Sequence, residues 1–270
     1  MNELLKASLY RGGVTPSYHR WRNARTLTVV MFHRVLPVGD AQWAEADPVW
    51  SVSDQAFLDC LRFFERHYNV IGMKDLTRAR GDAGELPERA LLITFDDGWA
   101  DTEWCALPIL KQRGLPAIVF VVADAVGRDP KMLTLDQLRN LHSTGVVIGS
   151  HGLTHTPIPQ APDAMTELRS SRAALARMLD VGEEEIDTFS FPHGLYTPMV
   201  ANRARECGYQ WLFTSDKGLR SIQPGHFLPD LMGRLNMDGR EICNSAGALK
   251  PERLASWLFA RDLIPMESRR

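Results

Sequence analysis

The strongest constraint on the fold is an apolar run that ends in two adjacent carboxylates. Ala90–Ile93 is apolar, and Thr94–Gly98 (Thr-Phe-Asp-Asp-Gly) follows it directly. A short apolar run of this kind is typical of a strand that is buried on both faces. Ionised carboxylates at the end of a buried strand lower the stability of the fold unless their charge is paired or they serve a function. Because the chain turns where the strand ends, Asp96 and Asp97 can both face one cleft.

A second apolar run ends in a pair of histidines. Val146–Ile148 precedes Ser150–His155, which places His151 and His155 four residues apart, so that one loop or helical turn can offer both imidazoles to a single cation. Two imidazoles and one carboxylate suit zinc, cobalt, nickel or ferrous iron, and the second carboxylate is then left as a base. The alternatives are a helix cap at the carboxylate pair and a turn with one buried histidine.

Strand-like and helix-like segments alternate along most of the chain. Strands are expected at Leu27–Phe32, Ala90–Phe95, Ala117–Val122, Val146–Ser150, Thr188–Phe191, Trp211–Thr214 and Leu231–Leu235. Helices are expected at Asp54–His67, Asp101–Arg113, Leu135–Ser143, Asp163–Leu179, Pro198–Cys207 and Arg253–Leu263. This alternation predicts an α/β fold with parallel strands and right-handed crossovers.

Composition excludes several classes of function. The 270 residues suit one large α/β domain or at most two small ones, and the balance of 31 basic against 33 acidic residues gives no basic field for nucleic acid. The four cysteines show no CxxC spacing, which favours reduced thiols in the core over a zinc knuckle or a redox motif.

The expected location of the protein in the cell rests on its N-terminal segment. Met1–Gly13 lacks the continuous apolar region of a signal peptide, so we expect a cytoplasmic protein. Residues 1–26 are basic and contain Trp21, which allows peripheral contact with an anionic membrane. A solvated arm packed on the domain is the preferred interpretation, because the hydrophobic periodicity of this segment is poor.

The motifs together resemble the polysaccharide deacetylase family, the carbohydrate esterases built on the NodB homology domain. The resemblance rests on Thr94–Gly98, Ser150–His155 and Phe191–Gly194, and it extends over most of the chain from Leu27 to Met237. It implies a distorted (β/α)7 barrel over residues 27–240, with an N-terminal arm at 1–26 and a C-terminal helix and tail at 241–270. Function would lie at the carboxyl ends of the barrel strands.

The resemblance also implies roles for these residues. Asp97, His151 and His155 would bind a divalent transition metal, most simply zinc, and Asp96 would be the base that takes a proton from water. The backbone N–H of His193, which occupies a position that is often an aromatic residue in the family, would face the oxyanion.

Two departures from the family pattern leave the acid and the partner of the base open. The Arg that often precedes Pro192 is absent, and so is the C-terminal Leu-x-His. Met31–Val35 is similar to the opening of exopolysaccharide deacetylases that also lack the Leu-x-His motif. His33 is therefore the candidate acid, with His193 as the runner-up. Arg234, or else Arg34, is the candidate partner of Asp96.

The predicted function is a metal-dependent hydrolase that removes N-acetyl groups from a sugar, glycan or glycolipid. One alternative is hydrolysis of another non-peptide C–N bond on the same fold. The other is an inactive carbohydrate-binding barrel, which would not need to retain Asp96.

Overall fold

The computed structural model describes residues 2–80, 85–222 and 228–264, and its contacts divide the chain into two compact units. The first unit comprises Met1–Ile93, Lys217–Leu228 and Leu235–Arg270. The second comprises Thr94–Asp216 and Pro229–Arg234. The part of the tail beyond residue 264 lies outside the described residues.

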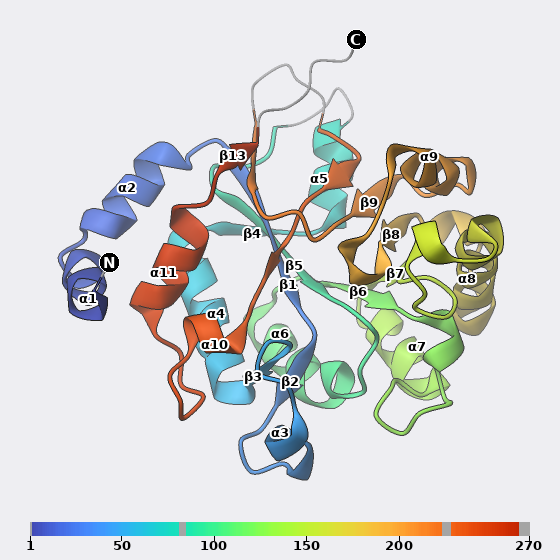
Figure 1. Cartoon of the computed structure of the whole chain (residues 1–270), viewed down its shortest axis with the longest axis horizontal. Coiled ribbons are helices and arrows are strands. Elements are labelled where there is room, and N and C mark those ends of the chain that lie inside the picture. The colour runs from blue at the N-terminus through green and yellow to red at the C-terminus, as the bar shows by residue number, and fades with distance from the viewer. Residues whose placement is uncertain (1, 81–84, 223–227, 265–270) are drawn as a thin grey trace. The chain divides into compact units, whose positions relative to one another are not determined.

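The second unit is built on one row of parallel strands. In spatial order these are β11 (Leu231–Met232), β9 (Trp211–Phe213), β8 (Thr188–Ser190), β7 (Val147–Ser150), β6 (Ile118–Val121) and the end of β5 (Ala90–Phe95). Its helices are α6 (Leu107–Arg113), α7 (Leu135–Ser143), α8 (Ala164–Leu179) and α9 (Pro198–Glu206), and Figure 1 shows α7, α8 and α9 on the outer side of their strands. Short π or 3-10 turns lie at Thr102–Ala106, Ala123–Ala125, Ile158–Gln160, Glu183–Glu185 and Pro192–Gly194.

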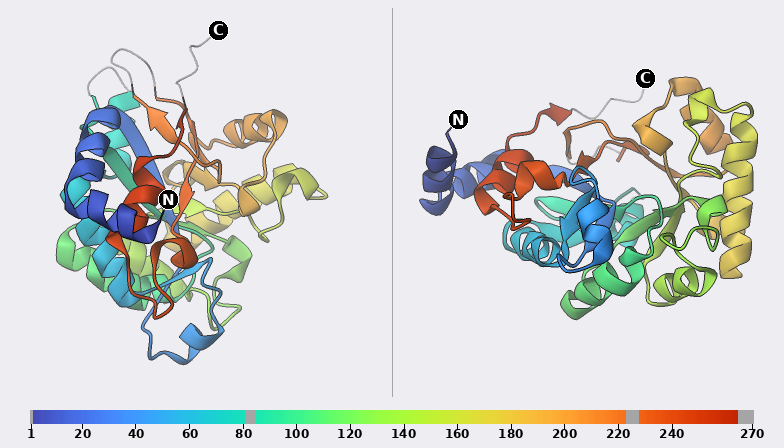
Figure 2. Two further views of the ribbon diagram at one scale, coloured as in Figure 1. Left: turned by 60° about the vertical axis from the view of Figure 1, so that its left-hand side comes forward. Right: turned by 60° about the horizontal axis from the view of Figure 1, so that its bottom comes forward.

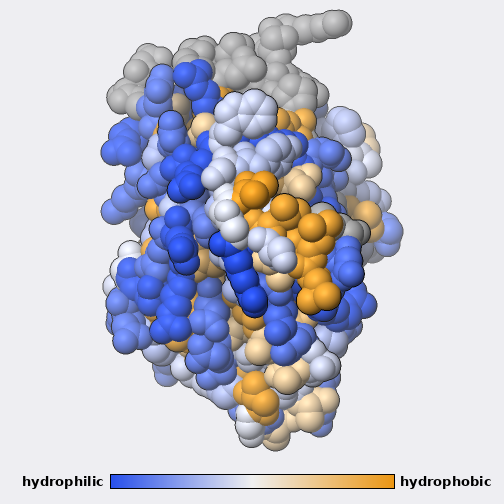
Figure 3. All heavy atoms as spheres, turned by 90° about the vertical axis from the view of Figure 1, so that its left-hand side faces the viewer, coloured by the Kyte–Doolittle hydropathy of each residue, from blue (hydrophilic) through white to orange (hydrophobic). Residues whose placement is uncertain are grey.

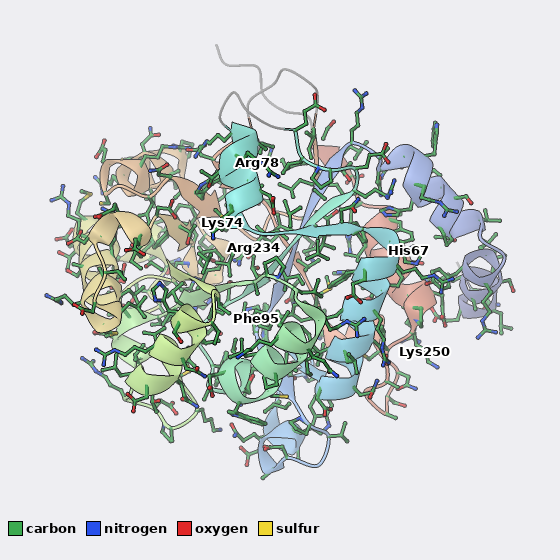
Figure 4. All side chains as sticks on the ribbon, turned by 180° about the vertical axis from the view of Figure 1, so that it is seen from behind. His67, Lys74, Arg78, Phe95, Arg234 and Lys250 are labelled. Carbon is green, nitrogen blue, oxygen red and sulfur yellow. The ribbon has the colours of Figure 1, made fainter. Side chains whose placement is uncertain are left out.

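The row of strands in the second unit must curl, because its two ends meet. Six flat strands would separate the end strands by roughly 24 Å at about 4.8 Å per strand. Arg234, two residues after β11, nevertheless donates to the Thr94 hydroxyl of β5 over 3.3 Å. Its guanidinium lies over the rings of Phe120 from β6 and Phe213 from β9, so it fills the interior of the curled row. Figure 4 shows Arg234 and Phe95 among the strands.

The first unit contains the remaining strands and the helices near both ends of the chain. β1 (Thr26–Phe32) lies between β5 and its partners β10 (Leu219–Ser221), which is antiparallel, and β12 (Leu235–Asn236), which is parallel. β4 (Asn69–Ile71) pairs with β5, β13 (Leu263–Ile264) with β10, and β2 (Arg34–Leu36) with β3 (Ser51–Ser53). The helices are α1 (Glu3–Arg11), α2 (Val14–Arg22), α3 (Ala41–Glu45), α4 (Asp54–His67), α5 (Met73–Arg80), α10 (Gly239–Ile242) and α11 (Pro251–Phe259).

Most predicted elements are confirmed, and three of them keep their predicted bounds: Asp54–His67, Ala90–Phe95 and Leu135–Ser143. The two helices among them, α4 and α7, each begin after a residue whose side chain caps the first turn. This residue is Ser53 for α4 and Thr134 for α7. All four cysteines are free and buried, as expected of core thiols. No helix in the described ranges is both long and apolar enough to cross a membrane.

Three predicted elements differ from the structure by more than one residue at an end. The helix expected at Arg253–Leu263 is α11 at Pro251–Phe259, and Leu263 begins β13. The strand expected at Leu231–Leu235 is two short strands, because Gly233 and Arg234 belong to neither β11 nor β12. At Gly233 an added Cβ would lie 2.3 Å from the backbone oxygen of Asp216. The helix expected to begin at Asp101 opens instead with the π-helical turn Thr102–Ala106. Pro108, which lacks a backbone N–H, follows that turn at the start of α6.

Acidification should destabilise the first unit through His19 and His67. Burial lowers the pKa of both rings to about 4. Unfolded rings bind a proton near pH 6.5, so between about pH 6.5 and 4 the unfolded state binds more protons and the free energy of unfolding falls as the pH falls. Each ring should lower the free energy of unfolding by about 2 kcal/mol when the pH falls from 7 to 5. Urea titrations at both pH values should show that His67→Phe loses about half of this decrease, and an unchanged decrease would contradict the assignment.

Candidate active site

Every ionisable residue of the second unit that the sequence singled out lies at one edge of the curled sheet. Asp96 and Asp97 follow β5, His151 follows β7, His193 follows β8 and Arg234 follows β11. Because all six strands are parallel, their carboxyl ends meet at the same edge. The strand topology therefore brings together residues that are up to 138 positions apart in the chain.

Three residues form a compact ligand set. One carboxylate oxygen of Asp97 lies 3.4 Å from Nε2 of His151 and 3.4 Å from Nε2 of His155, and the three ligand atoms all lie within 4.8 Å of one another. About 3.4 Å is the spacing of two ligand atoms around a tetrahedral ion with bonds of about 2.0–2.1 Å. One carboxylate and two imidazoles at this spacing fit a divalent transition metal, with coordination positions left open.

Hydrogen bonds fix the orientation of two of these ligands. Nδ1 of His151 donates to the Ser190 carbonyl over 2.9 Å, which leaves the Nε2 lone pair directed at the site. The second carboxylate oxygen of Asp97 accepts from the indole N–H of Trp99 over 2.9 Å. These contacts hold the ligand atoms in place through neighbouring groups, as is usual around metal centres.

The backbone at the site is strained. Asp97, His155 and His193 have φ values of 72°, 67° and 57°, and they are three of the five non-glycine residues with positive φ in the described part of the chain. Such conformations cost about 1–3 kcal/mol each and concentrate at functional sites. The helix cap considered for the carboxylate pair is wrong, since the N-cap residue of the first helical turn is Asp101.

Burial and charge set the protonation of the two histidines. Burial, reinforced by His151, lowers the pKa of His155 to about 4, so its ring is neutral at pH 7 as a metal ligand must be. Burial opposes the charged form of His151 too, but the carboxylates of Asp96 and Asp97 outweigh burial and raise its pKa. A cation that binds His151 must displace this proton, and its affinity should therefore decrease as the pH falls.

Asp96 lies in a buried ion pair with Arg234. The guanidinium donates Nη1–H to Oδ1 over 2.6 Å and Nη2–H to Oδ2 over 2.7 Å, and both side chains are at most 3% exposed. Arg234 also donates to the Ser190 hydroxyl over 2.7 Å and to the Thr214 carbonyl over 3.1 Å. The expected pairing of Arg234 with Asp96 is present, whereas Arg34 donates to Gln42 over 2.7 Å. Oδ2 of Asp96 lies 3.8 Å from Nε2 of His151, beside the ligand set.

The two candidate acids lie in different units. His193 is exposed, and its ring centroid is 4.6 Å from that of His155. His33 belongs to the first unit, where its ring centroid is 4.6 Å from that of Trp50. The assignment of His33 as the catalytic acid, with His193 as the alternative, stays a prediction.

Sequence reasoning missed the residue that supports the histidine loop. Glu167, buried on α8, accepts the backbone N–H groups of Leu153 and Thr154 over 2.9 and 3.1 Å and the Thr154 hydroxyl over 2.6 Å. These residues join His151 to His155. The available signal was a carboxylate within the apolar face of a long helix, next to Leu168.

The comparisons with known proteins agree with this class of site. The family model described as polysaccharide deacetylase matches residues 83–212, a span that holds the ligand set, Asp96 and His193. Over these residues the chain is similar to the polysaccharide deacetylase family. The match begins after His33 and ends before Arg234.

Two curated relatives illustrate the sequence similarity. The Bacillus subtilis protein YxkH, whose name assigns it to the polysaccharide deacetylases, is 29% identical over 144 residues, which are 52% of this chain and 50% of YxkH. The chain thus spans only about half the length of this relative. The Staphylococcus aureus poly-β-1,6-N-acetyl-D-glucosamine N-deacetylase is 22% identical over 199 residues, which are 68% of each chain.

Two solved structures show the fold. The deacetylase PplD of Streptococcus pyogenes has a TM-score of 0.70 at 21% identity, over 86% of this chain and 98% of its own. IcaB from Ammonifex degensii has a TM-score of 0.66 at 23% identity, over 87% and 98%. The predicted NodB-type α/β fold with mostly parallel strands is confirmed.

Removing the carboxylate of Glu167 should weaken the binding of zinc. Glu167→Ala frees the segment between His151 and His155, and losses of supporting contacts of this kind cost about 10–100-fold in metal affinity. Glu167→Gln should keep most of the affinity, because its oxygen can accept the two N–H groups while its amide donates to Thr154. Zinc titration against a chromophoric chelator measures this, with the exposed Glu206→Ala as control and His155→Ala as the limit of ligand loss. Equal affinity in Glu167→Ala and Glu206→Ala would contradict the role.

Proposed function

We propose that the protein is a metal-dependent hydrolase that removes N-acetyl groups from a glycan. The observation that carries this proposal is the juxtaposition of a three-ligand set with a separate, charge-paired carboxylate at the same strand ends. A binding module would need neither the ion nor a second buried carboxylate beside it. The named activity of the Staphylococcus aureus relative supports a substrate of N-acetylglucosamine units.

The roles follow from the contacts of each side chain. Asp97, His151 and His155 hold the ion, most simply zinc, which when bound polarises the amide carbonyl and lowers the pKa of water. Asp96 accepts the proton of the attacking water, and Arg234 with Ser190 fixes its orientation. The backbone N–H of His193 stabilises the oxyanion. The products are acetate and a free amine on the sugar, and the amine needs a proton as it departs.

The partners and the location of the protein stay predictions from the sequence. The substrate is an N-acetylated sugar or glycan, and whether it is free, nucleotide-linked, lipid-linked or polymeric depends on side chains outside this set. The cytoplasmic location stays a prediction. A second activity on another non-peptide C–N bond gains no specific support from the geometry of the site.

Asp96→Asn should abolish acetate release while zinc stays bound. The amide keeps the shape of the side chain but cannot take up the proton, and loss of a general base costs about 100-fold or more. Acetate release from poly-N-acetylglucosamine by zinc-loaded wild type tests the function, and elemental analysis of the variant tests its metal content. Near-normal turnover in Asp96→Asn would place the base elsewhere. Absence of acetate from free, nucleotide-linked, lipid-linked and polymeric N-acetyl sugars would overturn the proposed activity.

The departing amine should receive its proton from His33, with His193 as the alternative. An imidazole suits this step because its pKa lies near neutrality. His33→Ala should lower kcat strongly and remove the alkaline limb of the pH–rate profile, with little change in zinc affinity. The same effect in His193→Ala but not in His33→Ala would reverse the two roles.

A further inference from the structure

The N-terminal helices carry a concentration of exposed hydrophobic side chains. Leu4, Leu5, Val14, Tyr18 and Trp21 are 77%, 50%, 57%, 45% and 78% exposed. They are five of the twelve large hydrophobic residues that are exposed in the described part of the chain, yet they fall within its first 21 positions. Figure 3 shows hydrophobic residues gathered on the face that carries α1 and α2. We call this surface the N-terminal face.

The exposed side chains follow the geometry of a helix. Val14, Tyr18 and Trp21 are spaced four and three residues apart on α2, so they form one stripe on its outer side. The exposed Arg25 lies in the turn that follows α2. Leu4 and Leu5 lie in the first turn of α1, which Gly12 and Gly13 connect to α2. The exposed apolar side chains of the N-terminal face thus lie on two consecutive short helices.

The opposite side of α2 is anchored to the first unit, so the N-terminal face is presented rigidly. His19 is fully buried and stacks on Phe259 of α11 at 3.8 Å with an angle of 9° between the rings. Nε2 of His19 bonds to the carbonyl of His67 on α4, and Asn23 donates to the Phe259 carbonyl. Arg22 donates to the carbonyls of Phe259 and Arg261. The views in Figure 2 show α1 and α2 beside α11, and Figure 4 marks His67 at this end of α4.

The charge of the segment is strongly positive. Residues 2–25 contain five cationic side chains and one carboxylate, Glu3. Glu3 is already paired, since it accepts from Lys6 over 3.2 Å and from Arg253 over 2.7 Å. Arg11, Arg20 and Arg25 are exposed. The N-terminal face thus combines apolar side chains with cations that no nearby carboxylate of the segment neutralises.

We propose that the N-terminal face binds the surface of an anionic phospholipid membrane. Short helices with Trp and Leu on one side and arginines at its borders insert their apolar side chains at the level of the headgroups, while the cations contact lipid phosphates. Charge complementarity selects this partner over a second copy of the chain, because two such faces would bring like charges together. Contact through this face would place the chain at the membrane surface.

Sedimentation of the full chain with vesicles tests the proposal. The protein should sediment with vesicles of phosphatidylcholine containing about 30% phosphatidylglycerol, and much less with phosphatidylcholine alone. Binding should weaken with salt, because a surface potential is screened within a Debye length. Trp21→Ala together with Leu4→Ala should lower binding about ten-fold or more. Arg20→Glu should lower it about five-fold or more, from the loss of one cation near the surface.

Matched variants on the second unit serve as controls. Trp104→Ala removes another exposed tryptophan and Arg177→Glu reverses another exposed arginine, and both should bind vesicles like wild type. Circular dichroism and light scattering should show that every variant keeps its fold and its mass. Wild-type protein that stays in solution with anionic vesicles would overturn the proposal, and so would equal losses in the controls. A dimer that only Trp21→Ala dissociates would identify the face as a contact between copies instead.

Discussion

The ion pair of Arg234 with Asp96 is the interaction on which the second unit depends. It links the first and last strands of the row, and it does so inside the curled sheet between the rings of Phe120 and Phe213. Breaking a buried pair by removing one partner typically costs about 3–5 kcal/mol, because the remaining charge has no compensation. Here the guanidinium also bonds to Thr94, Ser190 and Thr214, so its five donors tie together four strand ends. The contact that holds the two ends of the row together therefore also orients Asp96, the proposed base.

The ligand set depends on this closure in a less direct way. Ser190 takes part in both halves of the site, since its hydroxyl accepts from Arg234 and its carbonyl accepts from His151. The left-handed conformations of Asp97, His155 and His193 are tolerated because such contacts over-determine the surrounding chain. Gly98 adds a close approach, as an added Cβ there would lie 3.1 Å from Val121. We therefore regard the geometry as preorganised for a cation and not as a chance cluster of histidines.

The N-terminal face suggests how such a site could meet its substrate. The proposed reaction uses the carboxyl edge of the second unit, whereas the proposed lipid contact uses two helices that pack on α11 in the first. The two functions are thus carried by separate residues, and each can be altered without removing a residue of the other. A glycan held at a membrane surface would be present at a higher local concentration for a protein bound to the same surface.

The sequence could predict those features of the fold and the site that depend on interactions between residues close together in the chain. Periodicity and capping are local, so Asp54–His67, Leu135–Ser143 and Ala90–Phe95 could be predicted with their bounds. The motifs around Asp97 and His151 are local too, so the sequence could predict that these residues lie together and that the chain resembles the family. The two helices of residues 2–25 were missed, because His19 is the only residue that they bury and the apolar stripe therefore faces solvent.

The remaining features arise from contacts between distant segments. The partner of Asp96 lies 138 residues away, and the sequence alone favoured Arg234 but left Arg34 open as an alternative. Glu167 supports the histidine loop only because α8 packs beside β7. The close approach of the Asp216 backbone to Gly233 is likewise a contact between distant segments. The sequence by itself predicted the residues to which we assign the chemistry, and the tertiary structure decided which of them touch, because a buried charge selects its partner by position in space and not by distance along the chain.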